Sequence, residues 1–305
     1  MTTLRQLRFL AALADTLSFS RAAEACHVTQ STLSTGLKEL EGALGVQLAE
    51  RTRQSVLMTP IGIVAARRAR SVLADVVELE EEARREAGGA ASGLRLGAIP
   101  TVGPFVMPHA LPRIRAAFPE AKVFLREDLT GSLIERLLDG RLDLAIVALP
   151  HDLPHEIHAE PLFDDGYRLA TPRGHPFANR EVVGGEELAG HGLLLLERGH
   201  CLQRHALSSF PGVALTEDES FAATSLPTLI AMVAQGLGLT LLPDLAVEAG
   251  ATREQDVALT RLPGANPRHI VLAWRRTSAR VATFRAVGRC IVAARAAMAD
   301  GRKAR

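Results

Sequence analysis

The stretch FSRAAEACHVTQSTLSTGLKELEGAL, residues 19–44, contains the pattern that decides the fold of the first part of the chain. Its second half is predicted to be helical, because leucines recur at positions 33, 37, 40 and 44. The turn HVTQ precedes that helix, and Ser20 is expected to cap a shorter helix over residues 21–26. Upstream, leucines at positions 4, 7, 10, 13 and 17 predict a first amphipathic helix.

The helix that follows HVTQ has a polar face opposite its leucines. The side chains on that face are Gln30, Ser31, Ser34, Thr35 and Lys38. Hydroxyls and amides reach base edges in a major groove, and an ammonium group binds a phosphate. Next, the stretch VQLAERTRQSVLMTPIG places Arg51 and Arg53 in a turn between short extended runs, as in a wing on the DNA backbone. By periodicity alone, a small helical bundle with a polar surface helix fits equally well.

A long helix is predicted after the wing. Thr59 caps it and Pro60 occupies its first turn, while Gly88 and Gly89 end it. Its apolar positions are Ile61, Ala65, Ala69, Val72, Val76, Leu79 and Ala83. A stripe of this length favours pairing with a second helix over packing on its own domain. We therefore expect residues 60–88 to link two domains and to dimerise.

The remaining two thirds of the chain alternate strands and helices, which is typical of an α/β domain with a largely parallel sheet. The pattern occurs twice, so two lobes are expected, and the late strand HIVLAW and the last helix return to the first lobe. The predicted boundaries are 1–59 for the DNA-reading domain and 89–305 for the second domain. Within the latter, lobe I covers about 94–163 plus 268–300, and lobe II about 164–267.

Ligands of open α/β sheets bind beyond the carboxyl ends of the strands. The residues at those ends form the expected cleft, and they are Thr101, Thr130, Pro150, His200, Cys201, Thr224 and Ser225. Each Thr or Ser alone is more often an ordinary cap or turn residue.

Cys201 follows the apolar run LLLL and is expected to open a helix. Helix amino termini and cationic neighbours, here His200 and Arg204, favour the thiolate form of a cysteine, which is the strong nucleophile. The thiol would then be open to oxidation. The alternative is an inert, partly buried cysteine.

Composition excludes several classes of protein. The formal charge of +1 gives no bulk attraction to nucleic acid or membrane. Three widely spaced cysteines oppose a disulfide framework and a zinc cluster, and Pro154 opposes a metal site among the histidines of HDLPHEIH. Neither a phosphate-binding loop nor a nucleophile elbow is found. We therefore expect a cytoplasmic protein with no enzyme activity, cofactor or membrane association.

The residues quoted above resemble the winged helix-turn-helix of LysR-type transcriptional regulators. The resemblance rests on FSRAAEACHVTQSTLSTGLKELEGALGVQLAERT followed by LMTPIG. It implies a DNA-reading helix carrying Gln30, Ser31, Ser34 and Lys38, and a wing with Arg51 and Arg53. It also implies a bilobed, periplasmic-binding-protein-like effector domain. Two departures are Gly36, where a long polar side chain is usual, and Ala49, where a bulky apolar residue is usual. Both are expected to alter DNA site preference or affinity.

Within this family, IPTVGPFVMPHALP, LLLLERGHCL and ATSLPTLIAMVAQGLGLTLLP resemble the OxyR-like, peroxide-sensing branch. The resemblance implies that peroxide oxidises Cys201 in a pocket shaped by His200, Thr101 and Thr130. It departs at Phe210, where the branch has a second cysteine, and at Arg204, where it has an acidic residue. The usual intramolecular disulfide is therefore not expected.

The sequence thus predicts a multidomain α+β and α/β regulator that responds to oxidation of Cys201. Its expected partners are double-stranded promoter DNA, RNA polymerase and further copies of itself, as a homodimer and homotetramer. The main alternative is a LysR-type regulator that binds a small-molecule effector in the cleft and does not sense through Cys201. A solute-binding module and an α/β enzyme are weaker rivals, which the first sixty residues and the missing catalytic constellation oppose.

Overall fold

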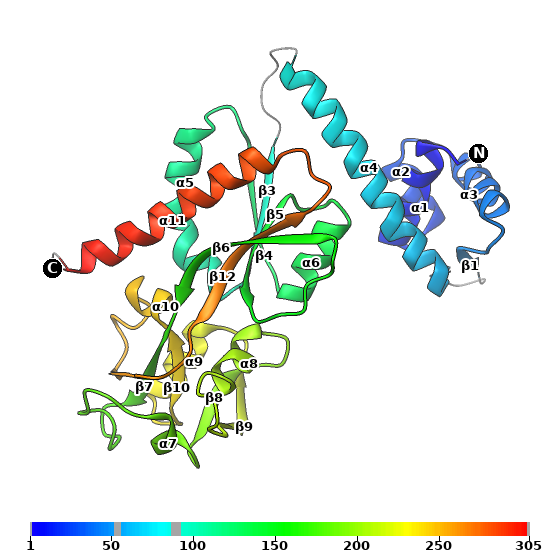
Figure 1. Ribbon diagram of the computed structural model, residues 1–305. Coiled ribbons are helices and arrows are strands. Elements are labelled where there is room, and N and C mark those ends of the chain that lie inside the picture. Colours follow the sequence, from blue (N-terminus) through cyan, green and yellow to red (C-terminus); the bar gives the residue numbers. More distant parts are fainter. Residues whose placement is uncertain (1, 52–55, 87–92, 304–305) are drawn as a thin grey trace. The chain divides into compact units, whose positions relative to one another are not determined.

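The structure is a computed structural model that describes residues 2–51, 56–86 and 93–303 (Figure 1). The chain divides into two compact units. The first contains Met1–Ala90 and Arg136–Arg141, and the second contains Ala91–Glu135 and Leu142–Arg305. The predicted combination of an all-helical reader with a wing and a mixed α/β domain is confirmed. Across the described residues, no helix has both the length and the hydropathy that a membrane span requires.

The first unit is a helix-turn-helix with a short hairpin and a long final helix. Its elements are α1 (Leu4–Thr16), α2 (Phe19–Ala25), α3 (Gln30–Leu44), β1 (Ala49–Arg51), β2 (Val56–Met58) and α4 (Pro60–Glu86). Strands β1 and β2 pair antiparallel, as a wing requires. The core consists of leucines of α1 and α3, the alanines of α2, and Ala66 and Ala69 of α4. Residues 52–55, between β1 and β2 in the sequence, lie outside the described part of the chain.

Helix α2 begins earlier than predicted. Ser18, not Ser20, is its cap, since Ser18 is extended and its hydroxyl accepts a hydrogen bond from the Arg21 amide at 3.4 Å. Ser20 lies inside the helix, and its Oγ donates to Oε1 of Gln30 at 3.2 Å. The Ser20 side chain therefore orients the first residue of α3 instead of starting α2.

The two departures in the reader are explained by packing. Gly36 faces α1, and a methyl group added there would lie 2.7 Å from the ring of buried Phe9. The glycine thus allows close contact between two helices. Ala49 lines a hollow of about 830 Å³ beside Leu10, Leu13 and Leu37. A larger side chain at Ala49 would have space there.

Lobe I of the second unit is built on a sheet in the order β4-β3-β5-β12-β6. Its elements are β3 (Leu94–Ala98), α5 (Gly103–Ala117), β4 (Val123–Glu127), α6 (Thr130–Leu138), β5 (Leu144–Leu149), β6 (Ile157–Asp165), β12 (Arg268–Arg275) and α11 (Val281–Lys303). Strands β4, β3 and β5 are parallel, but β12 runs antiparallel to β5 and β6. The sheet is therefore mixed, and the prediction of a largely parallel sheet is wrong for its β12–β6 side, because β12 re-enters from lobe II.

Lobe II surrounds a separate apolar core. Its elements are β7 (Tyr167–Pro172), α7 (Gly185–Leu188), β8 (Gly192–Leu196), α8 (Cys201–Leu207), β9 (Thr216–Ala223), α9 (Leu226–Ala234), β10 (Thr240–Pro243), α10 (Asp244–Glu248) and β11 (Val257–Arg261). Strand β7 pairs antiparallel with β10 and β11, while β8 and β9 are parallel. The chain passes between the lobes at β6–β7 and again just before β12, so Asp165 and Arg268 meet as a strand pair at this crossing.

Candidate functional site

Cys201 is the first residue of α8 and lies in a small closed hollow. The thiol-bearing residue is 9% exposed. The hollow is small and is lined by Ile99, Pro100, Thr101, Leu129, Thr130, His200 and Cys201. No part of it admits a water-sized sphere, so its walls must shift slightly to admit any ligand. The four residues predicted for a redox site are therefore brought together around one space.

Strand ends explain why these residues meet. Thr101 follows β3, and Thr130 is the first residue of α6 after the neighbouring parallel strand β4. His200 and Cys201 come from lobe II, at the start of α8 after β8. Side chains from the carboxyl ends of two adjacent strands thus face the first turn of a helix from the other lobe.

An unpartnered hydroxyl faces this hollow. Thr130 is 2% exposed, and its Oγ1 has no hydrogen-bond partner among the described residues. A buried hydroxyl without a partner costs about 1–3 kcal/mol. A small polar ligand in the hollow would remove that cost.

The sequence predicts His200 and Arg204 as cationic neighbours of Cys201, but the structure does not place a positive charge from either residue beside the thiol. Burial lowers the pKa of His200, although Glu197 raises it, so His200 is neutral near pH 7. Arg204 points away, and its Nη2 donates to the Pro150 carbonyl at 3.0 Å. The buried guanidinium of Arg268 is close enough to Cys201 to interact with it electrostatically.

Arg268 is buried where the chain crosses between the lobes, and it joins β12 to the end of β6 and to Thr101. Its guanidinium donates to Oγ1 and to the carbonyl of Thr101, at 2.7 and 3.0 Å, and to Oδ2 of Asp165 at 2.8 Å. Burial alone would lower the pKa of Arg268, but Asp165, Tyr167 and Cys201 raise it above its ordinary value. Arg268 therefore stays cationic and fixes Thr101 at the edge of the hollow.

Pro150, Thr224 and Ser225 do not line this hollow. The carbonyl of Pro150 instead accepts hydrogen bonds from Arg204 and from His205 Nε2, the latter at 2.8 Å. Thr224 is exposed, and the Ser225 hydroxyl accepts from the Thr228 amide as the cap of α9. For Thr224 and Ser225 the ordinary reading as turn and cap residues fits the structure.

Acid is expected to destabilise the second unit through His205. Burial lowers the pKa of His205 from 6.5 to about 4, with smaller contributions from the charges of Arg268 and Arg204, although the hydrogen bond to the Pro150 carbonyl raises it. The unfolded chain then binds more protons between pH 6.5 and 4, so stability is full above pH 6.5 and falls by up to about 3 kcal/mol as the pH drops to 4. Urea unfolding at pH 7.5, 6, 5 and 4 measures this loss.

The variant His205→Gln is the matched control, because its amide can still donate to the Pro150 carbonyl but has no proton to gain. Its stability should vary less with pH than that of the wild type. Equal pH dependence in the two proteins would show that His205 is not the responsible group.

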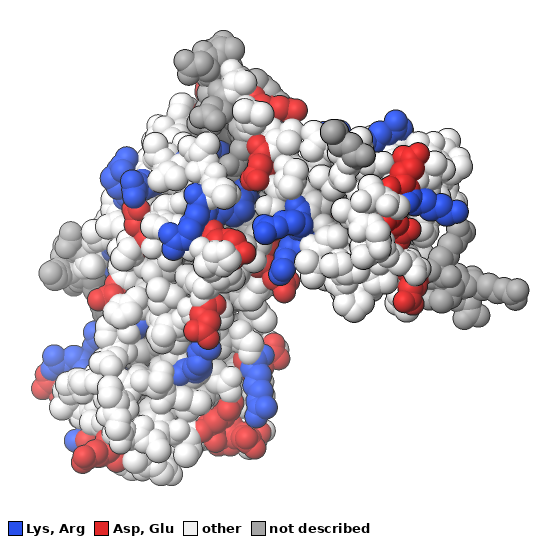
Figure 2. All heavy atoms as spheres, turned by 45° about the vertical axis from the view of Figure 1, so that its right-hand side comes forward, with Lys and Arg blue, Asp and Glu red and all other residues white. Residues whose placement is uncertain are grey.

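Helix α3 carries the four helix residues that the sequence predicts to contact DNA, and three of them are exposed. Gln30, Ser31 and Lys38 are exposed, and Ser34 is half-buried at the edge of the hollow beside Ala49. The backbone of Arg51 lies in β1, while Arg53 falls outside the described residues. Figure 2 shows Lys and Arg interspersed with Asp and Glu on the face drawn, so this face offers local contacts rather than a continuous basic surface.

Comparison with known proteins gives matches over both parts of the chain. The model for the bacterial regulatory helix-turn-helix protein of the lysR family matches residues 4–63, and the model for the LysR substrate binding domain matches residues 87–296. The DNA-binding transcriptional dual regulator OxyR of Escherichia coli K12 is 43% identical over 272 residues, 89% of each chain. A probable hydrogen peroxide-inducible genes activator of Streptomyces viridosporus is 41% identical over 288 residues, 92% of this chain and 91% of the relative.

Solved structures agree. A mutant of full-length OxyR from Pseudomonas aeruginosa has a TM-score of 0.78 and 33% identity over 95% of both chains. A hydrogen peroxide-bound mutant of Corynebacterium glutamicum OxyR has a TM-score of 0.63 and 32% identity, over 98% of this chain and 94% of that one. The chain therefore belongs to the LysR family of bacterial helix-turn-helix regulators and is OxyR-like within that family.

Proposed function

We propose that this DNA-binding regulator responds to hydrogen peroxide through Cys201. The observation that carries the proposal is the closed hollow, in which the thiol and the unpartnered Thr130 hydroxyl share a space too small for a typical metabolite. Drug-sized ligands need pockets of about 300–1,000 Å³. Hydrogen peroxide is only slightly larger than a water molecule, so a small shift of the walls would admit it, whereas a metabolite would need the hollow to open widely.

The chemistry is a single substitution at oxygen. The Cys201 thiolate attacks one peroxide oxygen, an S–O bond forms and the O–O bond breaks. Sulfur is oxidised to the sulfenic acid and peroxide is reduced. The second oxygen leaves as hydroxide and takes a proton to become water. Arg268 supplies the positive charge for the anionic thiolate, while Thr130 and Thr101 orient the peroxide.

The oxidised product is a sulfenic acid rather than an intramolecular disulfide. Position 210 holds Phe210, which is buried in the lobe II core. The other two cysteines of the chain are also free thiols. Cys26 lies at the end of α2, and Cys290 lies within α11. Neither lines the hollow.

The test is peroxide treatment of the full chain in the presence of dimedone, followed by peptide mass analysis. We expect Cys201 to be labelled at low peroxide and Cys290 to remain unlabelled. The variant Cys201→Ser should bind DNA but lose the response, and Cys290→Ser should behave as the wild type. If Cys201 reacts no faster than free cysteine, the protein is instead a regulator whose Cys201 does not sense.

DNA contacts are proposed for α3 and the wing, through Gln30, Ser31, Ser34, Lys38, Arg51 and Arg53. We expect Ser34→Ala to change the preferred bases, and Arg53→Ala to weaken binding to all sequences and to reduce the salt dependence by about one counterion. Fluorescence anisotropy over a salt series measures both effects. Unchanged affinity and preference in the two variants would contradict the assignment.

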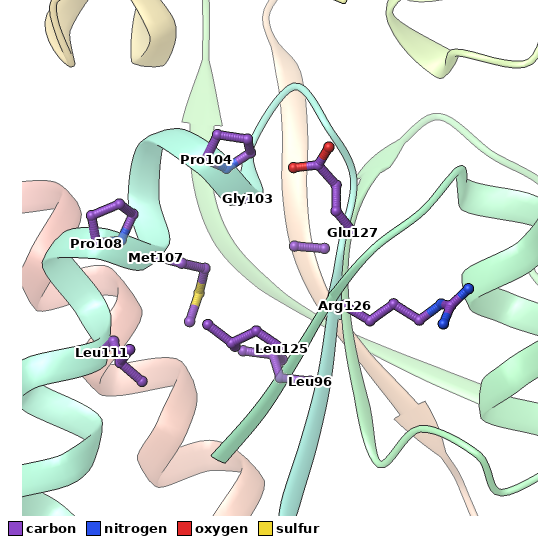
Figure 3. A pocket seen from close by; sticks show the side chains of 10 residues that line it. Leu96, Gly103, Pro104, Met107, Pro108, Leu111, Leu125, Arg126 and Glu127 are labelled. Atoms are coloured by element: carbon purple, nitrogen blue, oxygen red, sulfur yellow. The ribbon is translucent and has the colours of Figure 1, made fainter.

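Self-association is proposed through two surfaces. The first is α4, where Val72 and Leu79 are exposed although Ala66 and Ala69 pack on their own unit. The second is the edge of lobe I. There, β4 has one unpaired edge with Phe124 and Leu125 exposed, beside an apolar hollow of about 760 Å³ (Figure 3). Exposed apolar edges mark association sites. Two such surfaces on one chain support a dimer and, through both, a tetramer.

Charges placed in the α4 stripe are expected to separate the copies of the chain. Val72→Asp with Val76→Asp should shift the mass in light scattering by half, because two carboxylates would be buried at the pair interface. The matched control is Val77→Asp, on another side of α4. A wild-type monomer at micromolar concentration would refute the proposed assembly. With this assembly we propose a cytoplasmic regulator that acts on RNA polymerase at promoters and needs no cofactor.

A further inference from the structure

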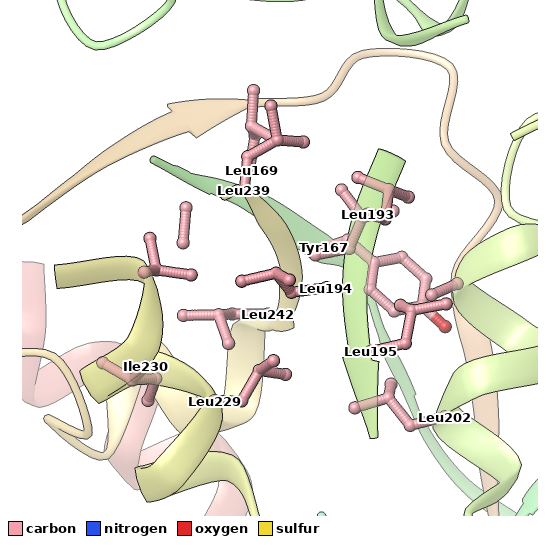
Figure 4. Close-up of a cluster of buried hydrophobic side chains, with 14 of the residues drawn as sticks. Tyr167, Leu169, Leu193, Leu194, Leu195, Leu202, Leu229, Ile230, Leu239 and Leu242 are labelled. Atoms are coloured by element: carbon pink, nitrogen blue, oxygen red, sulfur yellow. The ribbon is translucent and has the colours of Figure 1, made fainter. Parts of the chain in front are cut away.

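Tyr167, the single tyrosine of the chain, is buried at the start of β7. It is 5% exposed, and its hydroxyl has no hydrogen-bond partner within the described part of the chain. The ring packs in the lobe II core, which also contains Leu195 and Leu202. In Figure 4 the hydroxyl points out of the leucine cluster on the side where Leu202 lies, the residue next to Cys201.

The Tyr167 hydroxyl does not line the hollow, but it points toward the side of lobe II where α8 begins and is within electrostatic range of Cys201. Arg268, Asp165 and Cys201 all act on it electrostatically. Burial raises the pKa of the Tyr167 phenol well above its ordinary value, so the phenol stays protonated and remains a donor at any physiological pH. Two residues before it, Asp165 holds Arg268, which in turn holds Thr101 at the hollow.

The unpartnered Tyr167 hydroxyl lowers the stability of the reduced protein. A buried hydroxyl without a partner is destabilising, whereas one that bonds to an oxygen on the neighbouring sulfur gains a bond made only in the oxidised state. An interaction that differs between two states shifts the equilibrium toward the state in which it is made. Tyr167 is thus suited to recognise the product of oxidation and not the thiol.

We propose that the Tyr167 hydroxyl donates a hydrogen bond to the oxygen that peroxide leaves on Cys201, and so retains the sulfenic acid in a site without a second thiol. This inference rests on the proposed function. The oxidation is the step already written, in which the thiolate gains one peroxide oxygen and the other leaves as water. Tyr167 gives up no proton and forms no covalent bond.

The variant Tyr167→Phe removes only this hydroxyl. Because the hydroxyl has no partner in the reduced protein, the reduced variant should be as stable as the wild type or more stable, as measured by urea unfolding. After a pulse of hydrogen peroxide and its removal by catalase, dimedone is added at increasing delays. The sulfenic acid should disappear about five- to tenfold faster in the variant, with more overoxidised Cys201 at higher peroxide.

Thr171→Val is the matched control. Thr171 lies on the same strand, is buried, and its hydroxyl also lacks a partner among the described residues, but it lies four residues further along β7, away from the Asp165–Arg268 pair. It should keep the wild-type lifetime. As an independent readout, the near-ultraviolet absorption of the single tyrosine should change when wild-type protein is oxidised, and should not change in Cys201→Ser.

The outcomes separate the two proposals. Equal sulfenic acid lifetimes in wild type and Tyr167→Phe, with Cys201 oxidised in both, would overturn the role of Tyr167 and leave peroxide sensing intact. Absence of dimedone labelling at Cys201 in the wild type would overturn the proposed function, and this inference with it. A shorter lifetime in Thr171→Val as well would show a general loosening of β7 and would also overturn the role of Tyr167.

Discussion

Arg268→Met is expected to lower the free energy of unfolding of the second unit by about 3–5 kcal/mol, because it leaves Asp165 charged and buried without its cation. Asp165 and Arg268 are both fully buried, and their side chains meet at 2.8 Å. The variant also removes the two hydrogen bonds that hold Thr101. Trp274, the single tryptophan, lies buried on the same strand, so its fluorescence during urea unfolding reports this unit.

The same substitution should slow oxidation of Cys201 at least tenfold, since one tenfold step in rate corresponds to only about 1.4 kcal/mol of lost electrostatic stabilisation. Stopped-flow peroxide consumption, or dimedone labelling against time, gives the rate. Rate and stability test different roles of Arg268, so both must be measured on the same preparation.

Asp165→Asn in the Arg268→Met background separates charge from packing. The asparagine keeps an acceptor for the Leu245 amide, which bonds to Asp165 Oδ1 at 2.8 Å, but carries no unpaired charge. The double variant should therefore recover part of the lost stability without recovering the oxidation rate. A loss of less than about 1 kcal/mol in Arg268→Met would contradict the structural role of Arg268. A wild-type oxidation rate would contradict its role as the source of positive charge for the thiolate.

The same site shows which functional residues can be predicted from the sequence and which cannot. Thr101, Thr130, His200 and Cys201 could be identified, because strand ends and a helix start are local signals and the family resemblance joined them. The role of Arg268 could not be predicted from the sequence, because Arg268 and its partner Thr101 lie 167 positions apart in the chain. The sequence does show a charged residue, Arg268, at the start of the apolar run RHIVLAW, which is unusual for a buried strand. It does not show which buried partner this residue contacts.

Local packing accounts for the other differences. Gly36 was expected to alter DNA contacts because a helix pattern does not show that its small side faces Phe9. Arg204 was expected to act on Cys201 because it lies one helical turn away, whereas its guanidinium bonds to the Pro150 carbonyl. Proximity along a chain places a charge near a thiol only if no better acceptor is within reach.

Phe210→Cys is expected to destabilise the second unit by about 2–4 kcal/mol without giving a ready disulfide. The Phe210 ring fills the lobe II core so closely that a methyl group added at Gly185 would lie 2.6 Å from it, so a smaller side chain leaves a cavity. Phe210→Leu should cost less, because more of the volume is kept. Urea unfolding followed through Trp274 compares the two variants.

The introduced thiol is kept apart from Cys201 by α8. That helix runs from Cys201 to Leu207 and alone separates its ends by about 9 Å along its axis, while bridged cysteines have Cα atoms about 4.4–6.8 Å apart. A disulfide in Phe210→Cys therefore requires part of α8 to unwind. After peroxide treatment, the amides of residues 202–207 should lose protection from hydrogen exchange as the disulfide forms. The double variant Phe210→Cys with Cys201→Ser is the control. It should show the loss of stability from the cavity, but no disulfide and no loss of protection. A disulfide that forms while α8 stays protected would show that the helix does not hold the two positions apart, and that the chain lacks a disulfide switch only because it lacks the second sulfur.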